Sequence, residues 1–217
     1  MRNLVLISAL FALFLSGCAQ KTYDYSAFLN SQPKSILVLP PTSSSNDLKA
    51  SAGVGANAIL PLCENGYYVF PMTLVYEIFK QNGISEPHEM AQVPLQKLKR
   101  YFGADAVLYL DVPVYGSSYR LIKSSTDVEI HAKLVDINSG ATLWERTASA
   151  TNESGSSGGL LGILISAVVT QIVHSVMDES YNVASNANFM LFERDCNNCI
   201  LRGQYSPKFR QDAQLAK

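Results

Sequence analysis

The stretch from Thr126 to Thr151 reads TDVEIHAKLVDINSGATLWERTASAT, and it holds the clearest structural pattern in the chain. Along Thr126–Ile137 apolar and polar residues alternate, with Val128, Ile130, Ala132 and Leu134 on one side and Asp127, Glu129, His131 and Lys133 on the other. This alternation is typical of a strand in an antiparallel sheet with one solvated face. Asn138-Ser139-Gly140 fits a three-residue hairpin loop, so Ala141–Thr151 is predicted as the partner strand.

Three segments before this hairpin also predict strands. Ser35–Pro40 (SILVLP) is a short apolar run of the kind found in buried strands. Tyr67–Phe70 (YYVF) follows the turn signal Asn65-Gly66. Ala106–Val114 (AVLYLDVPV) is a further strand, in which Pro113 indicates a sheet edge or a strand end.

Helices are predicted between these strands. Leu48–Glu64 could be helical, although two glycines and a proline weaken that pattern. Apolar residues at helical spacing follow Pro71 and Pro94, and Gly83 and Gly103 are expected to end these two helices. The predicted fold class is therefore α/β, a mixed β-sheet packed with helices.

The N-terminus has the features of a secretory signal. Arg2 precedes the apolar run Leu4–Leu15, which is shorter than the roughly 20 residues needed to cross a bilayer. The run continues into Leu15-Ser16-Gly17-Cys18, which resembles the bacterial lipobox. We therefore expect residues 1–17 to be removed as a signal peptide and Cys18 to be acylated, with palmitate among its chains, as a membrane anchor.

The residues after Cys18 suggest where the protein resides and how it is organised. Cys18 is followed by Ala19 rather than aspartate, which by known sorting rules points to the outer membrane and its periplasmic face. Residues 18–34 are expected to form a lipid-anchored tether, residues 35–183 the α/β domain, and residues 184–217 a C-terminal extension that packs on the domain and has a flexible end. The formal net charge of −1 argues against a nucleic-acid partner.

Three further cysteines would lie in the oxidising periplasm. Cys196 and Cys199 form a CxxC motif in a polar stretch, away from the strand and helix that a redox CxxC normally joins. A small structural disulfide between them is expected, with pairing to Cys63 and a redox or metal role as alternatives. Cys63, next to Leu60 and Leu62, is interpreted as a buried small apolar residue.

Leu160–Met177 (LLGILISAVVTQIVHSVM) predicts a long apolar helix near the C-terminus. Such a helix is buried in its own core, forms an oligomer contact, or lies against the membrane. Gln171 and His174 interrupt it before it reaches a membrane-spanning length. The candidate interaction residues are Leu160, Leu161, Ile163, Leu164, Val168 and Ile172.

Three motifs that could indicate chemistry have simpler explanations. The GxGxxA match at 53–58 does not follow directly after a strand, as a dinucleotide site requires. The GxSxG match at 155–159 lies in a glycine- and serine-rich loop. Asp127, Glu129 and His131 could share a metal, although a solvated strand face is the commoner arrangement. We therefore expect no enzyme activity, catalytic residue, cofactor or metal.

Several sequence blocks together resemble a known family. ILVLP after the lipobox tether, FGADAVLYLDV and KLVDINSGATLW resemble an uncharacterised family of bacterial outer-membrane lipoproteins. Their domain is similar to the N-terminal domain of TolB, and distantly to the secretion lipoproteins CsgG and PelC and to lipoprotein activators of penicillin-binding proteins. PPTSSSNDLKAS, GYYVFP and FKQNG match the family too, over about residues 35–207 in all. The resemblance implies a TolB-like fold and a role in envelope assembly or secretion, with a CsgG-like protein as a partner.

Two functions follow as hypotheses. In the first, the protein is a non-enzymatic assembly or accessory component that contacts a protein partner or a second copy of itself. In the second, it is a ligand-binding or regulatory lipoprotein that contacts peptidoglycan or a cell-wall synthase. The second hypothesis predicts a concave site lined by Tyr109, Tyr115 and Tyr119.

Overall fold

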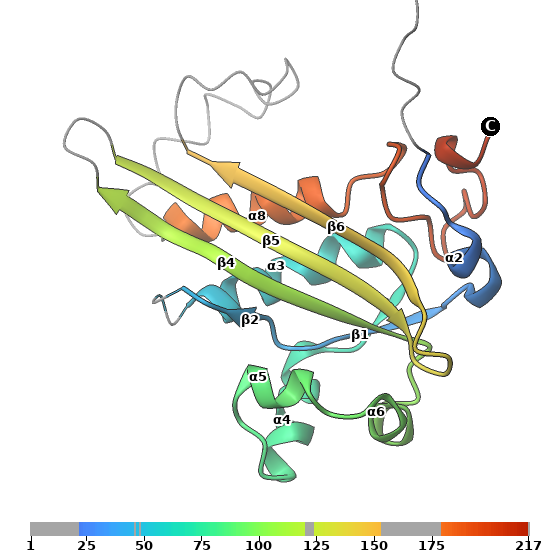
Figure 1. Cartoon of the computed structure of the whole chain (residues 1–217), viewed down its shortest axis with the longest axis horizontal. Coiled ribbons are helices and arrows are strands. Elements are labelled where there is room, and N and C mark those ends of the chain that lie inside the picture. Colours follow the sequence, from blue (N-terminus) through green and yellow to red (C-terminus); the bar gives the residue numbers. More distant parts are fainter. Residues whose placement is uncertain (1–21, 46, 48, 120–123, 153–178, 217) are drawn as a thin grey trace, which may run out of the picture.

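A mixed sheet of six strands organises the molecule (Figure 1). The computed structural model describes residues 22–45, 47, 49–119, 124–152 and 179–216. The strands are β1 (Ser35–Val38), β2 (Thr42–Ser43), β3 (Tyr68–Val69), β4 (Ala106–Tyr119), β5 (Ser124–Asp136) and β6 (Thr142–Thr151). Their order is β3-β1-β4-β5-β6, and β2 pairs with β4 beyond the end of β1. β1 is parallel to β3 and β4, whereas β4, β5 and β6 are antiparallel. The predicted mixed α/β class is confirmed.

The hairpin β5–β6 has the predicted alternation and a left-handed glycine at its turn, but the predicted three-residue loop is one residue longer, because the Asp136 N–H donates to the Ala141 carbonyl. Val128, Ile130, Ala132 and Leu134 are all buried, at most 4% exposed. Gly140 has φ +74° at the turn. Asp136 Oδ1 accepts hydrogen bonds from the backbone N–H groups of Asn138 and Ser139, which fixes the loop.

The interpretation of Pro113 as a strand end is wrong, because β4 continues to Tyr119. Its interpretation as an edge signal holds locally, since the pairing of β4 with β2 ends at Val112 and the described residues beyond pair with β5 alone. The pairing of β4 with β5 shifts its register between Asp111 and Val114. Pro113 lies within this irregularity, where its missing N–H removes no regular ladder hydrogen bond.

Two helices cover one face of the sheet and enclose the main core. α3 (Ala50–Glu64) and α8 (Glu179–Leu191) lie side by side behind β4, β5 and β6 (Figure 1). Gly53 lets α3 approach the sheet closely, because a Cβ atom there would lie 2.7 Å from the Tyr115 hydroxyl. This core holds the largest buried side chain, Trp144.

A smaller core lies on the opposite face, at the β1 side of the sheet. α4 (Met72–Gln81), α5 (Pro87–Ala91) and α6 (Leu95–Phe102) pack against Leu37, Leu39 and Val107. The helices predicted after Pro71 and Pro94 are present as α4 and α6, and Gly103 ends α6 in the left-handed conformation. The sequence pattern did not predict α5.

The expected tether at 18–34 and the domain boundary at 183 both need correction. Residues 22–34 include α2 (Ser26–Ser31), and Tyr25 and Phe28 beside it are 5% and 4% exposed. α8 crosses the expected boundary, because residues on either side of it, from Ser180 to Leu191, are buried against the sheet and α3. The C-terminal residues also pack on the domain, with Cys199, Ile200 and Leu201 buried, and end in a short 3₁₀ helix, Ala213–Leu215.

The predicted apolar helix Leu160–Met177 lies outside the described residues. Among the residues that are described, no helix is long and apolar enough to cross a membrane.

Gly66→Ala is expected to lower the free energy of unfolding by about 2 to 3 kcal/mol. The new Cβ would strain a backbone in the left-handed region and would also collide with neighbouring atoms. Gly66 has φ +88°, and a Cβ there would lie 2.6 Å from the Cβ of Ser206. Urea denaturation followed by circular dichroism measures the change. Gly83→Ala is the matched control, because Gly83 has φ +79° with nothing within 4 Å. It should cost about 1 kcal/mol, and equal losses would contradict the packing argument.

Candidate functional site

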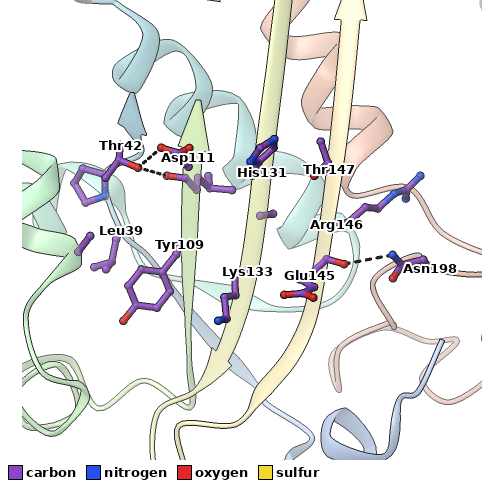
Figure 2. A pocket seen from close by; sticks show the side chains of 14 residues that line it. Leu39, Thr42, Tyr109, Asp111, His131, Lys133, Glu145, Arg146, Thr147 and Asn198 are labelled. Carbon is purple, nitrogen blue, oxygen red and sulfur yellow. Dashed lines mark hydrogen bonds between the residues drawn. The ribbon is translucent and has the colours of Figure 1, made fainter. Parts of the chain in front are cut away.

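The outer face of the antiparallel strands carries an open concavity of about 560 Å³. β4, β5 and β6 form its floor, on the side of the sheet opposite α3 and α8 (Figure 2). Leu39 and Pro40 after β1 and Ala91 of α5 border it at one side, and Asn198 of the C-terminal segment borders it at the other.

The strand register arranges the floor in two rows that cross the sheet. The first row is Tyr109, Lys133 and Glu145, and the second is Asp111, His131 and Thr147. Each row takes one residue from each strand, so the rows follow from the alternation along each strand together with the strand order and register. Figure 2 shows these side chains on the same face of the three strands.

Acidic and basic groups are mixed on this floor. Thr42 Oγ1 donates a hydrogen bond of 2.6 Å to Asp111 Oδ1, which holds that carboxylate at the edge of the concavity. His131 Nε2 lies 2.8 Å from Glu129 Oε1, and both side chains are more than one-third exposed. Burial raises the pKa of the Tyr109 hydroxyl, so it stays protonated and can donate a hydrogen bond. The site is suited to a small polar molecule that carries both charge signs.

Of the three tyrosines predicted to line a site, the structure places Tyr109 at the concavity. Tyr115 is 7% exposed in the main core, under α3. The register shift between Asp111 and Val114 turns it to the other face, which simple alternation from Tyr109 does not anticipate. The side chain of Tyr119 lies outside the described part of the chain.

The polar strand residues considered for a metal are not gathered as a ligand set. His131 pairs with Glu129, and Asp127 accepts a hydrogen bond from Ser125. Within the described ranges, a group with ligand atoms close together is formed by Glu193, Cys196 and Cys199. A disulfide joins the two sulfur atoms of this group, so neither is available as a thiolate ligand.

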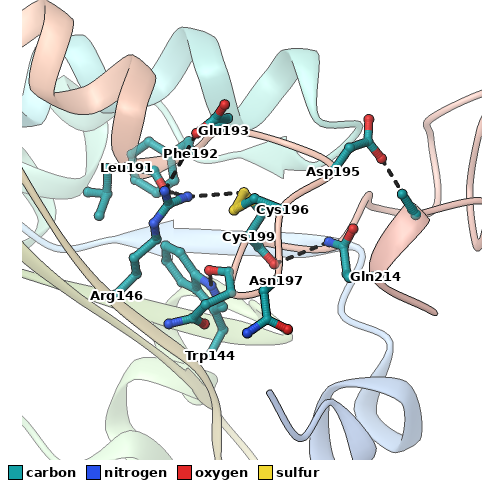
Figure 3. Close-up of a disulfide and its surroundings, with 12 residues drawn as sticks. Trp144, Arg146, Leu191, Phe192, Glu193, Asp195, Cys196, Asn197, Cys199 and Gln214 are labelled. Atoms are coloured by element: carbon teal, nitrogen blue, oxygen red, sulfur yellow. Dashed lines mark hydrogen bonds and ion pairs between the residues drawn. A yellow bond between two sulfur atoms is a disulfide. The ribbon is translucent and has the colours of Figure 1, made fainter. Parts of the chain in front are cut away.

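The disulfide between Cys196 and Cys199 lies at a junction of distant segments (Figure 3). Tyr25, from the N-terminal segment, donates a hydrogen bond of 2.5 Å to the Cys199 carbonyl. Trp144 of β6 donates one of 3.2 Å to the Asn198 carbonyl. Arg146 Nη1 lies 3.1 Å from Cys199 Sγ and also donates to the Leu191 carbonyl at the end of α8. The loop therefore connects the start of the domain, its edge strand and its last helix.

The interpretation of Cys63 as a buried residue is wrong, since Cys63 is exposed and has a free thiol. It lies near the C-terminal end of α3, and its apolar neighbour Leu62 takes the buried position instead. The pairing of Cys63 with one of the other cysteines is likewise excluded by the disulfide within the CxxC motif.

Replacing both Cys196 and Cys199 with serine is expected to lower the free energy of unfolding by about 2 kcal/mol, because the unfolded chain regains the conformational entropy that the closed loop removes. Thermal unfolding with and without a thiol reductant measures this, and the reductant should lower the stability of the parent protein but not that of the double variant. Cys63→Ser is the matched control and should change stability by less than about 0.5 kcal/mol. An unchanged unfolding temperature in the double variant would contradict a stabilising role of the disulfide.

The remaining candidate residues lie outside the described ranges. These are Cys18 and the apolar positions Leu160, Leu161, Ile163, Leu164, Val168 and Ile172. Sequence reasoning missed the concavity itself, because its floor depends on strand order. The alternation of Glu129, His131 and Lys133 was the available signal, and it was interpreted as a solvated face.

Comparison with known proteins adds the following relationships. The profile of the family described as "Putative lipoprotein GNA1162-like" matches residues 23–205. A lipoprotein of Neisseria meningitidis serogroup B is 44% identical over 204 residues, which cover 92% of this chain and 94% of the relative. The crystal structure of lipoprotein GNA1162 from Neisseria meningitidis is 47% identical, with a TM-score of 0.55 over 66% of this chain and 100% of that chain. PelC from Paraburkholderia phytofirmans is 14% identical, with a TM-score of 0.45 over 72% of this chain and 84% of that chain.

Proposed function

Since the chain belongs to the GNA1162-like lipoprotein family, we propose that it acts as a non-enzymatic accessory component of an envelope assembly or secretion complex. In this proposal, acylated Cys18 anchors it in the outer membrane, and the folded domain faces the periplasm. A protein partner or a second copy then docks on the domain, and a CsgG-like protein is a candidate partner. The apolar segment Leu160–Met177 is the proposed contact.

The observation that carries the accessory role is the chemistry of the open sheet face. Its polar groups hold one another in pairs, Thr42 with Asp111 and Glu129 with His131. The Glu129 and His131 side chains are both more than one-third exposed. An open, solvated face with such groups is suited to contact with a partner.

The native mass of full-length protein, extracted in mild detergent, tests this proposal. A defined multiple of the subunit mass, or a stable second protein, is the expected result. Leu164→Glu with Val168→Glu should then dissociate the assembly, whereas the exposed pair Lys97→Glu and Arg100→Glu on α6 should leave it intact. A monomer without any second protein would overturn the assembly role.

The concavity favours a second candidate function, the binding of a cell-wall fragment. Its mixed charges and the Tyr109 ring suit the amines, carboxylates and sugar rings of muropeptides. Titration of the protein with purified muropeptides, followed by calorimetry, tests this. Lys133→Ala should weaken binding, and Lys97→Ala, on α6 outside the concavity, should not. Absence of binding by the parent protein would reject this function.

A further inference from the structure

The start of the folded domain lies very close to the proposed lipid anchor. Tyr23 is already part of the domain, because its hydroxyl accepts a hydrogen bond of 3.1 Å from the backbone N–H of Glu145. Tyr25 and Phe28 follow at once in the core. Only Ala19, Gln20, Lys21 and Thr22 separate Cys18 from Tyr23, and such a span reaches at most about 18 Å when fully extended.

This short connection fixes which end of the domain is near the membrane. Strand β4, with its 14 residues, is about 46 Å long at the usual rise per residue, so the sheet is much longer than the connection. α2 and the C-terminal residues lie together at one end of the sheet, and the tip of β4 and β5 lies at the other (Figure 1). The connection therefore leaves from the α2 end.

The residues beside α2 have the character of a membrane interface. Gln204 donates a hydrogen bond of 2.6 Å to the Gln32 carbonyl at the end of α2, and Phe209 and Arg210 line a small pocket together with Phe28 and Leu29. Nearby, Tyr205 is 67% exposed.

The charge of this surface matches anionic headgroups. Lys208 and Arg210 are both exposed, and the Arg210 guanidinium lies 5.6 Å from the centre of the Phe209 ring. From Cys196 to Gln211 the sequence contains no acidic residue. The neighbouring carboxylates of Asp195 and Asp212 are already ion-paired with Arg202. Phe209 is half-buried beside Lys208 and Arg210. Aromatic side chains next to exposed lysine and arginine are typical of protein surfaces that contact lipid headgroups.

We infer that the surface formed by Tyr205, Lys208, Phe209 and Arg210 beside α2 lies against the anionic headgroups of the anchoring membrane. This inference rests on the proposed anchoring through Cys18. It also places the other end of β6, where residues 153–178 begin and end, on the side away from the lipid. Asn152 and Glu179, which flank that segment, are hydrogen-bonded to each other.

Depth-dependent quenching in vesicles tests the inference. The full-length acylated protein, carrying Cys63→Ser, is labelled with a fluorophore at Gln211→Cys or at Thr151→Cys. It is then placed in phosphatidylethanolamine and phosphatidylglycerol vesicles with a headgroup spin label. Quenching at position 211 should exceed quenching at position 151 several-fold, and equal or reversed quenching would overturn the orientation.

Charge reversal separates headgroup contact from simple proximity. Lys208→Glu with Arg210→Glu should reduce quenching at position 211 several-fold, and Lys97→Glu with Arg100→Glu on α6 should leave it unchanged. No effect of the first pair would overturn the proposed headgroup contact. Vesicle flotation of the parent protein and of Cys18→Ala reports on the anchor. If the parent protein fails to float, the anchoring proposal fails. If it floats but the quenching order is reversed, only the orientation fails.

Discussion

Trp144→Ala is expected to lower the free energy of unfolding by about 3 to 5 kcal/mol, because it removes a large, fully buried aromatic side chain. Trp144 is 0% exposed and lies opposite Leu134 in the β5–β6 pairing. Its ring centre is 6.0 Å from that of Phe192, and its indole N–H binds the Asn198 carbonyl. Since Trp144 is the single tryptophan of the chain, urea unfolding must be followed by circular dichroism rather than by fluorescence.

Two controls separate the packing of the ring from its hydrogen bond. Trp144→Phe keeps most of the apolar volume and loses the N–H donor, so a loss of about 1 kcal/mol beyond the volume change is expected. Leu60→Ala removes an apolar side chain that is 57% exposed, and its effect should stay below about 0.5 kcal/mol. A loss in Trp144→Ala as small as that of Leu60→Ala would contradict the position of Trp144 in the core.

The hairpin could be predicted from the sequence because all of its determinants are local. Alternation along β5 assigns each side chain to a face, and the turn with Gly140 fixes which residues pair. The same holds for β1, whose apolar run is short and bounded by proline. Such elements need no information from distant parts of the chain.

The N-terminal segment shows why other elements could not be predicted. Residues 22–34 are mostly polar, so they resemble a tether in composition. They are held in place by hydrogen bonds to partners more than a hundred residues away in the sequence. Tyr25 bonds to the Cys199 carbonyl, and Ser31 bonds to Asp136. The boundary placed at residue 183 failed similarly, because α8 is held by the sheet and by α3 rather than by an amphipathic pattern of its own.

Only part of the candidate site could be predicted from the sequence. The polar face of β5 could be identified from alternation, but its neighbours Tyr109 and Glu145 depend on strand order and register. The irregularity at Pro113 then reverses the expected side of Tyr115. One inserted residue is enough to exchange the two faces of a strand, so periodicity alone could not place these tyrosines.

Arg202→Met is expected to lower the free energy of unfolding by about 3 to 5 kcal/mol, because it leaves a buried carboxylate without its cation. The Arg202 side chain is 9% exposed and lies 2.9 Å from Asp212 Oδ1 and 2.5 Å from Asp195 Oδ2. The Asp212 side chain is 1% exposed, and its Oδ2 is buried with no hydrogen-bond partner among the described residues. Chemical denaturation at neutral pH measures the loss.

The double variant Arg202→Met with Asp212→Asn should recover most of that loss, because the charge that needs the guanidinium is also gone.

The pH dependence of the free energy of unfolding gives a second, independent test. Burial raises the pKa of Asp212 above its ordinary value of 3.8, so its ionised form destabilises the fold above that pKa and the penalty disappears as the pH falls through it. The deficit of Arg202→Met should therefore shrink on acidification. Asp195 behaves oppositely, because its hydrogen bonds with Arg202 lower its pKa to about 2, but its carboxylate is 44% exposed and contributes little. A deficit that is unchanged by pH and by Asp212→Asn would show that Arg202 stabilises the fold through packing rather than through the buried charge.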